Sequence, residues 1–167
     1  MILNRQRRVR VRPVVLEEFL ARVRRTVGAG DESVSVCLVS DAAMAQMNKR
    51  FRGKRGPTDV LSFPSQGEFS YRGKSAARKV SLRKTPHGNR RWPRRSPVGG
   101  NYLGDIAISP QTARRNAGRF GRRLEVELRI LILHGVLHLL GYDHEADQGE
   151  MERLERRLRR KLRIDAP

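Results

Sequence analysis

The stretch LEVELRILILHGVLHLLGYDH covers residues 124–144 and holds the most regular apolar pattern of the chain. Between residues 124 and 140, apolar side chains occupy nearly the whole circumference of a helix, which indicates a central helix that is buried all round. Gly141 follows, and glycine most readily takes the left-handed conformation at which helices end. The stretch therefore predicts a buried central helix over 124–140 that ends in a tight turn.

The same stretch holds three of the four histidines of the chain, His134, His138 and His144. The first two are four residues apart, so their rings project from nearly the same face of a helix. Polar rings on so apolar a helix are costly to bury unless something binds them. Three imidazoles on one metal leave a fourth position open, as in catalytic zinc sites. We therefore expect one zinc ion per chain, although imidazole ligands also suit nickel, copper and iron.

The spacing His-x3-His-x2-Gly-x2-His is that of a large class of zinc proteases, which makes a metallopeptidase one alternative. Those proteases carry a glutamate general base directly after the first histidine, whereas this chain has Gly135 there. Without that carboxylate, the ability of zinc to activate water and polarise an oxyanion suits a phosphodiester better than a peptide. Asp143 is expected either to orient an imidazole or the water, or to be a polar turn residue.

Outward from the central helix, the hydrophobic periodicity indicates shorter elements, among them an edge strand of alternating apolar and basic residues at the start of the chain. Strands are expected over residues 2–12, 34–39, 58–64 and 103–109, and further helices over 13–27, 42–51, 110–120 and 146–163. We therefore predict an α+β fold, in which a small mixed four-stranded sheet packs with about five helices and the zinc site lies at the end of the central buried helix.

One segment, residues 66–100, interrupts this order with ten basic residues and one acidic residue. Apolar side chains have no regular spacing there, so we expect a mobile basic insertion within a single domain that covers 1–167. Arg90, Arg91 and Trp92 have the composition of a surface that binds RNA and stacks on unpaired bases. An insertion without a specific role is the alternative.

The whole chain is strongly basic, with 36 lysine and arginine residues against 17 acidic residues and a net charge of +19. Such a surface attracts polyanions, so RNA or DNA is the expected partner. Arginine accounts for 30 of the basic residues, a skew that a GC-rich genome would also produce. No stretch is long and apolar enough to span a membrane or to form a signal-peptide core, so we expect a cytoplasmic protein without a membrane partner.

The run His134–His144 resembles the signature of the YbeY family of bacterial rRNA-maturation endoribonucleases. Three further blocks resemble the family in order and approximate separation, so that the resemblance covers about residues 33–163. They are NKRFRG at 48–53, PTDVLSFP at 57–64 and LGDIAIS at 103–109.

The resemblance implies a zinc-dependent, single-strand-specific endoribonuclease that acts in maturation of the 16S rRNA 3′ end and in ribosome quality control. Its implied partners are single-stranded rRNA, the small ribosomal subunit and the assembly factors of that subunit. By position, the ligands of the family fall on His134, His138 and His144.

The functional arginine of the family falls on Arg52, whose guanidinium would hold a phosphate in bidentate fashion. Lys54 and Arg55 follow it and are expected to contact RNA. Arg55-Gly56 stands where the family usually has an acidic residue, and the segment 66–100 is longer and more basic than the family pattern. An RNA-binding ribosome assembly factor with a structural zinc is the alternative function.

Overall fold

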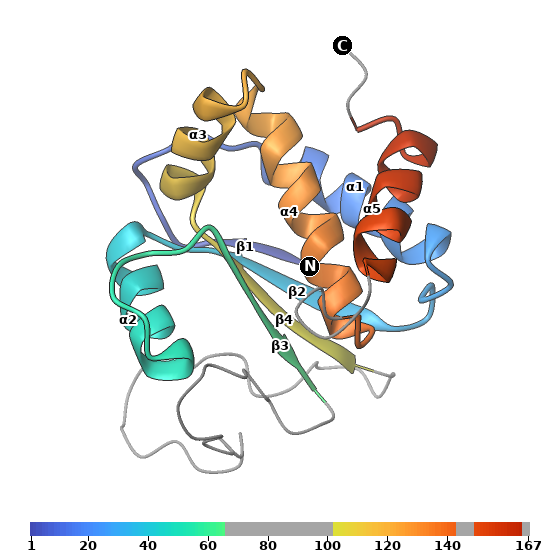
Figure 1. Ribbon diagram of the computed structural model, residues 1–167, viewed down its shortest axis with the longest axis horizontal. Helices are drawn as coiled ribbons and strands as arrows, with labels where there is room; N and C mark the ends of the chain where they lie inside the picture. Colours follow the sequence, from blue (N-terminus) through green and yellow to red (C-terminus); the bar gives the residue numbers. More distant parts are fainter. Residues whose placement is uncertain (66–101, 143–148, 165–167) are drawn as a thin grey trace.

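A mixed four-stranded sheet separates two unequal layers of helices in the computed structural model of the chain (Figure 1). The structure describes residues 1–65, 102–142 and 149–164. The strand order is β1-β2-β4-β3, and only β3 runs antiparallel to its neighbour. The strands are β1 (Ile2–Asn4), β2 (Ser33–Leu38), β3 (Val60–Pro64) and β4 (Tyr102–Ile108).

The two faces of the sheet carry different numbers of helices, which gives the fold one large core and one small core. The five helices of the described residues are α1 (Pro13–Thr26), α2 (Asp41–Arg52), α3 (Pro110–Arg119), α4 (Leu124–Leu139) and α5 (Glu150–Lys161). Helices α1, α4 and α5 share the large core with β2 and β4, whereas α2 packs on the other face against Leu61 and Phe63. The predicted α+β fold is confirmed.

Helix α4 is the central buried helix that the sequence predicts, and Figure 1 shows it crossing the sheet between α1, α3 and α5. Its carboxyl end forms a Schellman turn, in which the Gly141 amide donates to the His138 carbonyl and the Tyr142 amide donates to the Leu137 carbonyl. Gly141 has φ +91°, the left-handed conformation expected of it. Helix α4 therefore ends one residue after the second histidine.

The strand predicted over 2–12 is wrong beyond Asn4, although β1 does lie at the edge of the sheet. The Gln6 side chain closes a loop instead, because it donates to the Val9 carbonyl and accepts from the Val9 amide, each at 2.9 Å. Gln6 and Val9 are both buried, so the alternation at Val9 and Val11 reflects burial of a loop. Sequence periodicity alone does not distinguish such a loop from a strand.

The remaining predicted elements begin and end within two residues of their expected positions, apart from the start of the last helix. That helix is described from Glu150, and residues 146–148 of its predicted range lie outside the described residues. Its inner stripe is as predicted, since Met151 and Leu158 are buried and Leu154 packs against the same core. The predicted insertion at 66–100 also lies outside the described residues.

Asp41 joins the first turns of α2 and α3, the two helices that follow the parallel strands β2 and β4. Its carboxylate accepts hydrogen bonds from the hydroxyls of Ser109 and Thr112 and from the Arg115 guanidinium. Burial of the Asp41 carboxylate opposes its ionisation, but these hydrogen bonds outweigh that effect and lower its pKa. One ionised carboxylate therefore holds the starts of both helices at the same edge of the sheet.

Gly135 lets α4 approach β4 closely at the middle of the large core. A Cβ atom at this position would lie 2.8 Å and 2.9 Å from two side-chain carbons of Ile106, which is fully buried. The Gly135 carbonyl also accepts a hydrogen bond from the Ser62 hydroxyl at 3.3 Å. The depth of α4 over the sheet is thus set by the absence of a side chain at 135.

We expect Gly135→Ala to destabilise the protein by about 1–3 kcal/mol, because the added methyl overpacks a core without room for it. Gly118→Ala is the matched control, since Gly118 lies in α3 and a Cβ there would meet nothing within 4 Å. The control should instead stabilise by up to about 1 kcal/mol through helix propensity. Denaturant unfolding of both variants measures the difference, and equal stabilisation would contradict a close contact at Gly135.

Candidate metal centre

His134 and His138 face one another near the carboxyl end of α4. Their Nε2 atoms are 3.1 Å apart, with ring centroids 4.6 Å apart and ring planes at 78°. His134 is partly accessible, with 25% of its side chain exposed. The helical spacing of four residues therefore brings the two Nε2 atoms together at a partly exposed position, as the sequence predicts.

Glu155 of α5 contacts His134 at Nδ1, the ring nitrogen that does not face His138. Its Oε2 lies 2.9 Å from His134 Nδ1, and only 16% of the glutamate side chain is exposed. An ionised carboxylate can only accept, so Nδ1 carries the proton in this contact, and a neutral ring then has its lone pair on Nε2. The Arg159 guanidinium lies 3.7 Å from the other carboxylate oxygen of Glu155. The contact therefore selects the tautomer that can bind a metal through Nε2.

Glu155, which contacts the candidate ligand His134, is a site residue that the sequence patterns did not single out. It follows Leu154 and lies four residues after Met151, so it adjoins the apolar stripe that α5 turns toward α4. An acidic residue at the border of such a stripe was the available signal. What the sequence does not contain is the register of α5 against α4, which decides that this glutamate meets His134.

The donor set fits a zinc ion in its chemistry and in its spacing. Two nitrogens bound to one tetrahedral zinc are about 3.3 Å apart, given zinc–nitrogen bonds of about 2.0–2.1 Å. The Nε2 atoms of His134 and His138 are 3.1 Å apart. A carboxylate on the far nitrogen of a ligand histidine is the usual partner of zinc-binding imidazoles. The pair therefore supplies two ligands in an arrangement that a zinc ion can use.

The third predicted ligand, His144, lies outside the described residues, as does Asp143. Within the described part of the chain, no group of three histidine, cysteine or acidic side chains is arranged to hold a metal ion. The structure thus brings two of the three predicted ligands together. The assignment of His144 and of Asp143 stays a prediction.

The position after the first histidine cannot supply the general base of a zinc protease. A side chain at Gly135 would start in contact with Ile106, in the core between α4 and the sheet. Any side chain at position 135 would point into this core, which accounts for glycine at the position where those proteases have glutamate. Packing therefore adds a second reason against a peptidase mechanism.

Arg52 lies in the last turn of α2, in the helix layer on the other side of the sheet from the histidine pair. Strand β3 runs between the two layers, since Leu61 packs toward α2 while Ser62 bonds to the backbone of α4. The Arg52 side chain is half-buried, and α2 ends directly after it at Gly53. Arg52 and the histidines thus lie on opposite sides of one edge strand.

The loop after Arg52 is held by Asn48, whose Nδ2 donates to the Gly56 carbonyl at 2.9 Å. Asn48 is 5% exposed, so this hydrogen bond forms a buried anchor for a loop whose side chains point into solvent. Lys54 and Arg55 are exposed in that loop, as a surface that contacts RNA requires. The other predicted RNA-binding residues, Arg90, Arg91 and Trp92, lie outside the described residues.

None of the helices in the described ranges is long and apolar enough to cross a membrane. The large apolar surface of α4 is instead covered by the sheet and by the neighbouring helices.

Comparison with known proteins gives a match over nearly the whole chain. The family model described as Endoribonuclease YbeY matches residues 2–163. A Koribacter versatilis protein named Endoribonuclease YbeY is 38% identical over 164 residues, which cover 98% of this chain and 86% of that protein. An Aquifex aeolicus protein of the same name is 34% identical over 157 residues, 94% of this chain and 85% of its own length.

A solved structure also resembles this fold. The solution structure of a Thermotoga maritima protein aligns with a TM-score of 0.56 and 26% identity, covering 99% of this chain and 94% of that one. The family match includes all four sequence blocks, 48–53, 57–64, 103–109 and 134–144.

Proposed function

Because the chain belongs to the Endoribonuclease YbeY family, we propose that it is a zinc-dependent endoribonuclease that cleaves single-stranded RNA. One observation supports the zinc in this proposal. The Nε2 atoms of His134 and His138 face one another, and Glu155 contacts Nδ1 of His134. The net charge of +19 supports a polyanionic substrate. His144 completes the proposed ligand set.

Each residue of the proposed site has a separate task. His134 and His138 hold the metal through Nε2, and Glu155 keeps the His134 ring in the binding tautomer. When bound, zinc supplies a Lewis acid that activates water near neutral pH and offsets negative charge on a phosphate. Arg52 binds the phosphate and neutralises the charge that develops on it. Lys54 and Arg55 hold the adjacent RNA backbone.

The biological setting of this activity is part of the proposal. We place the enzyme in maturation of the 16S rRNA 3′ end and in ribosome quality control, in the cytoplasm, with the small subunit and its assembly factors as partners. We also propose that residues 1–167 form one domain and that the basic segment 66–100 is an insertion that binds RNA. Family membership and the basic composition of the chain support these statements.

Removing the metal with a chelator should abolish cleavage of a single-stranded RNA, and added zinc should restore it. His138→Ala should abolish cleavage too and should lose the bound zinc, while His87→Ala, a change of the fourth histidine of the chain, should keep the zinc. Circular dichroism and RNA binding are measured on the same samples. Cleavage that persists without metal would refute the proposed site. A His138→Ala protein that fails to fold would favour the structural zinc of the assembly-factor alternative.

Glu155→Gln should weaken zinc binding by about 10- to 100-fold, because the amide replaces the charged acceptor that holds His134 Nδ1. Competition for zinc with a chromophoric chelator measures this affinity without any reference to activity. Glu152→Gln is the control, since this glutamate is 71% exposed on the same helix and pairs with Arg156. Equal zinc affinity of the two variants would show that Glu155 does not support the metal.

Arg52→Ala should lower kcat for RNA cleavage by about 100-fold, the scale of losing one group that stabilises a developing charge. Arg52→Lys should recover only part of the rate, because lysine keeps the charge but lacks the bidentate fork. Arg50→Ala is the control, since Arg50 is an exposed residue of the same helix turn. Steady-state cleavage kinetics of the three variants test this, and full activity of Arg52→Ala would remove Arg52 from the site.

A further inference from the structure

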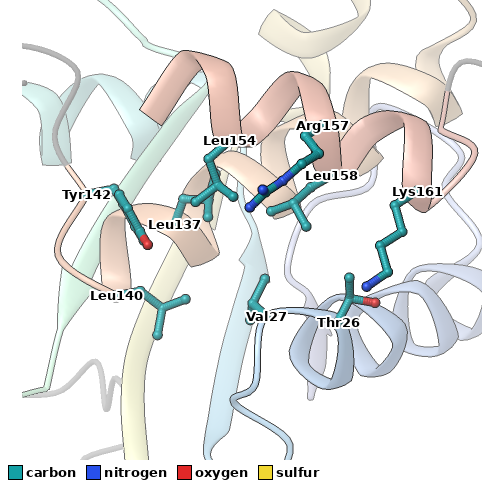
Figure 2. A pocket seen from close by; sticks show the side chains of 9 residues that line it. All are labelled: Thr26, Val27, Leu137, Leu140, Tyr142, Leu154, Arg157, Leu158 and Lys161. Carbon is teal, nitrogen blue, oxygen red and sulfur yellow. The ribbon is translucent and has the colours of Figure 1, made fainter. Parts of the chain in front are cut away.

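A cavity of about 460 Å³ lies beside the metal centre, between the ends of α1 and α4 and one face of α5 (Figure 2). Helix α5 separates the two places, because Glu155 turns toward His134 while Leu154, Arg157 and Lys161 line the cavity. Among the described residues, no group of the proposed ribonuclease site lines it. The cavity is therefore a distinct feature of the same pair of helices.

The cavity combines an apolar floor with an aromatic side chain. Leu137 and Leu140 from the end of α4 and Leu154 and Leu158 from α5 line it with aliphatic carbon. Tyr142, which follows the turn at Gly141, borders the cavity and remains 39% exposed. Figure 2 shows the tyrosine at one end of the cavity and Lys161 near Thr26 at the other. A flat apolar ligand could therefore stack on the ring and cover the leucines.

Two cations from one face of α5 complete the lining. Arg157 and Lys161 are four residues apart, so they lie one helical turn from each other, and both are exposed. Among the described residues, neither forms an ion pair, unlike their helix neighbours Arg156 and Arg159. Two uncompensated cations beside an apolar floor match a ligand with a flat apolar part and a separate anionic part.

We propose that this cavity binds one unpaired nucleotide of a single-stranded RNA, with the base against Tyr142 and the leucines and the phosphate at Arg157 and Lys161. The volume lies within the range of pockets for small organic ligands and is too small for a folded partner. The proposal rests on the ribonuclease function and extends it with a contact away from the scissile phosphate.

This contact would also give single-strand preference a physical origin. A base within a duplex must be unpaired and unstacked before it can enter the cavity, which costs a few kcal/mol. An unpaired base enters without that cost and gains stacking on an aromatic side chain. The cavity thus favours single-stranded over double-stranded RNA without sequence specificity, because every base presents a flat face.

The test compares two double variants of α5 that remove the same charge. Arg157→Ala/Lys161→Ala changes the cavity, whereas Arg156→Ala/Arg160→Ala changes exposed residues of the same helix that do not line it. Binding of a fluorescent 2′-O-methyl single-stranded oligonucleotide to the zinc-loaded protein is measured by anisotropy across a salt series. Electrophoresis verifies that the oligonucleotide stays intact, and circular dichroism verifies the fold of each variant.

The cavity variant should bind about 10-fold more weakly than the control variant. Its salt slope, log K against log salt, should also be smaller by about 1.4, as expected for the loss of two phosphate contacts on a single strand. A 5-iodouridine in the oligonucleotide should crosslink to Tyr142 under ultraviolet light, and Tyr142→Ala should lose that crosslink. A duplex of the same sequence should give none.

Equal affinity of the two double variants, with wild-type protein that binds and cleaves RNA, would overturn the cavity proposal and leave the ribonuclease intact. Conversely, wild-type protein that binds RNA through the cavity but never cleaves it would refute the ribonuclease and keep the cavity. A mononucleoside monophosphate that binds as tightly as the oligonucleotide would assign the cavity to a free nucleotide and overturn the RNA assignment. Displacement of the non-covalently bound oligonucleotide by an acidic peptide at lower concentration would overturn it in favour of a protein partner.

Discussion

The close contact between α4 and β4 at Gly135 is the constraint on which the rest of the structure depends. A helix that carries a side chain at this point would have to stand further from the sheet, because Ile106 is fully buried and has no free space beside it. The depth of α4 in turn places the neighbouring residue His134, and His138 one turn later. The histidine pair is thus positioned by a packing contact on a different face of the same helix.

Two further contacts fix what surrounds that helix. The Ser62 hydroxyl bonds to the Gly135 carbonyl, which ties β3 to α4 at the level of the first histidine. At the edge of the sheet where β2 and β4 end, the ionised carboxylate of Asp41 holds the starts of α2 and α3 together. Arg52 lies in the last turn of α2. The orientation of α2 over β3 therefore determines from which direction Arg52 approaches the proposed site. The proposed site therefore combines two helix layers that meet at one edge strand.

Local patterns predicted most of the elements because their causes are local. The apolar circumference of 124–140, the glycine at 141 and the inner stripe of α5 each depend on residues within a few turns of one another. The strand expected over 2–12 is wrong beyond Asn4, because a loop in which Val9 is buried produces the same alternation as a strand. Periodicity reports which residues are buried, and burial can be reached in more than one backbone conformation.

The site was predictable to the extent that its residues are close in sequence. His134 and His138 share one helix face, so their spacing alone brings them together. Glu155 is 21 residues away on another helix, and its contact with His134 depends on how α5 packs on α4, which no local pattern contains. The cavity has the same origin, because Leu137, Tyr142 and Arg157 meet only after that packing. One helix pair thus creates both features, and the register that directs Glu155 toward His134 also directs Arg157 and Lys161 away from it. Any substitution that shifts α5 by a turn would therefore disturb the contact of Glu155 with His134 and the cavity together, whereas a substitution confined to either face of α5 would disturb only one.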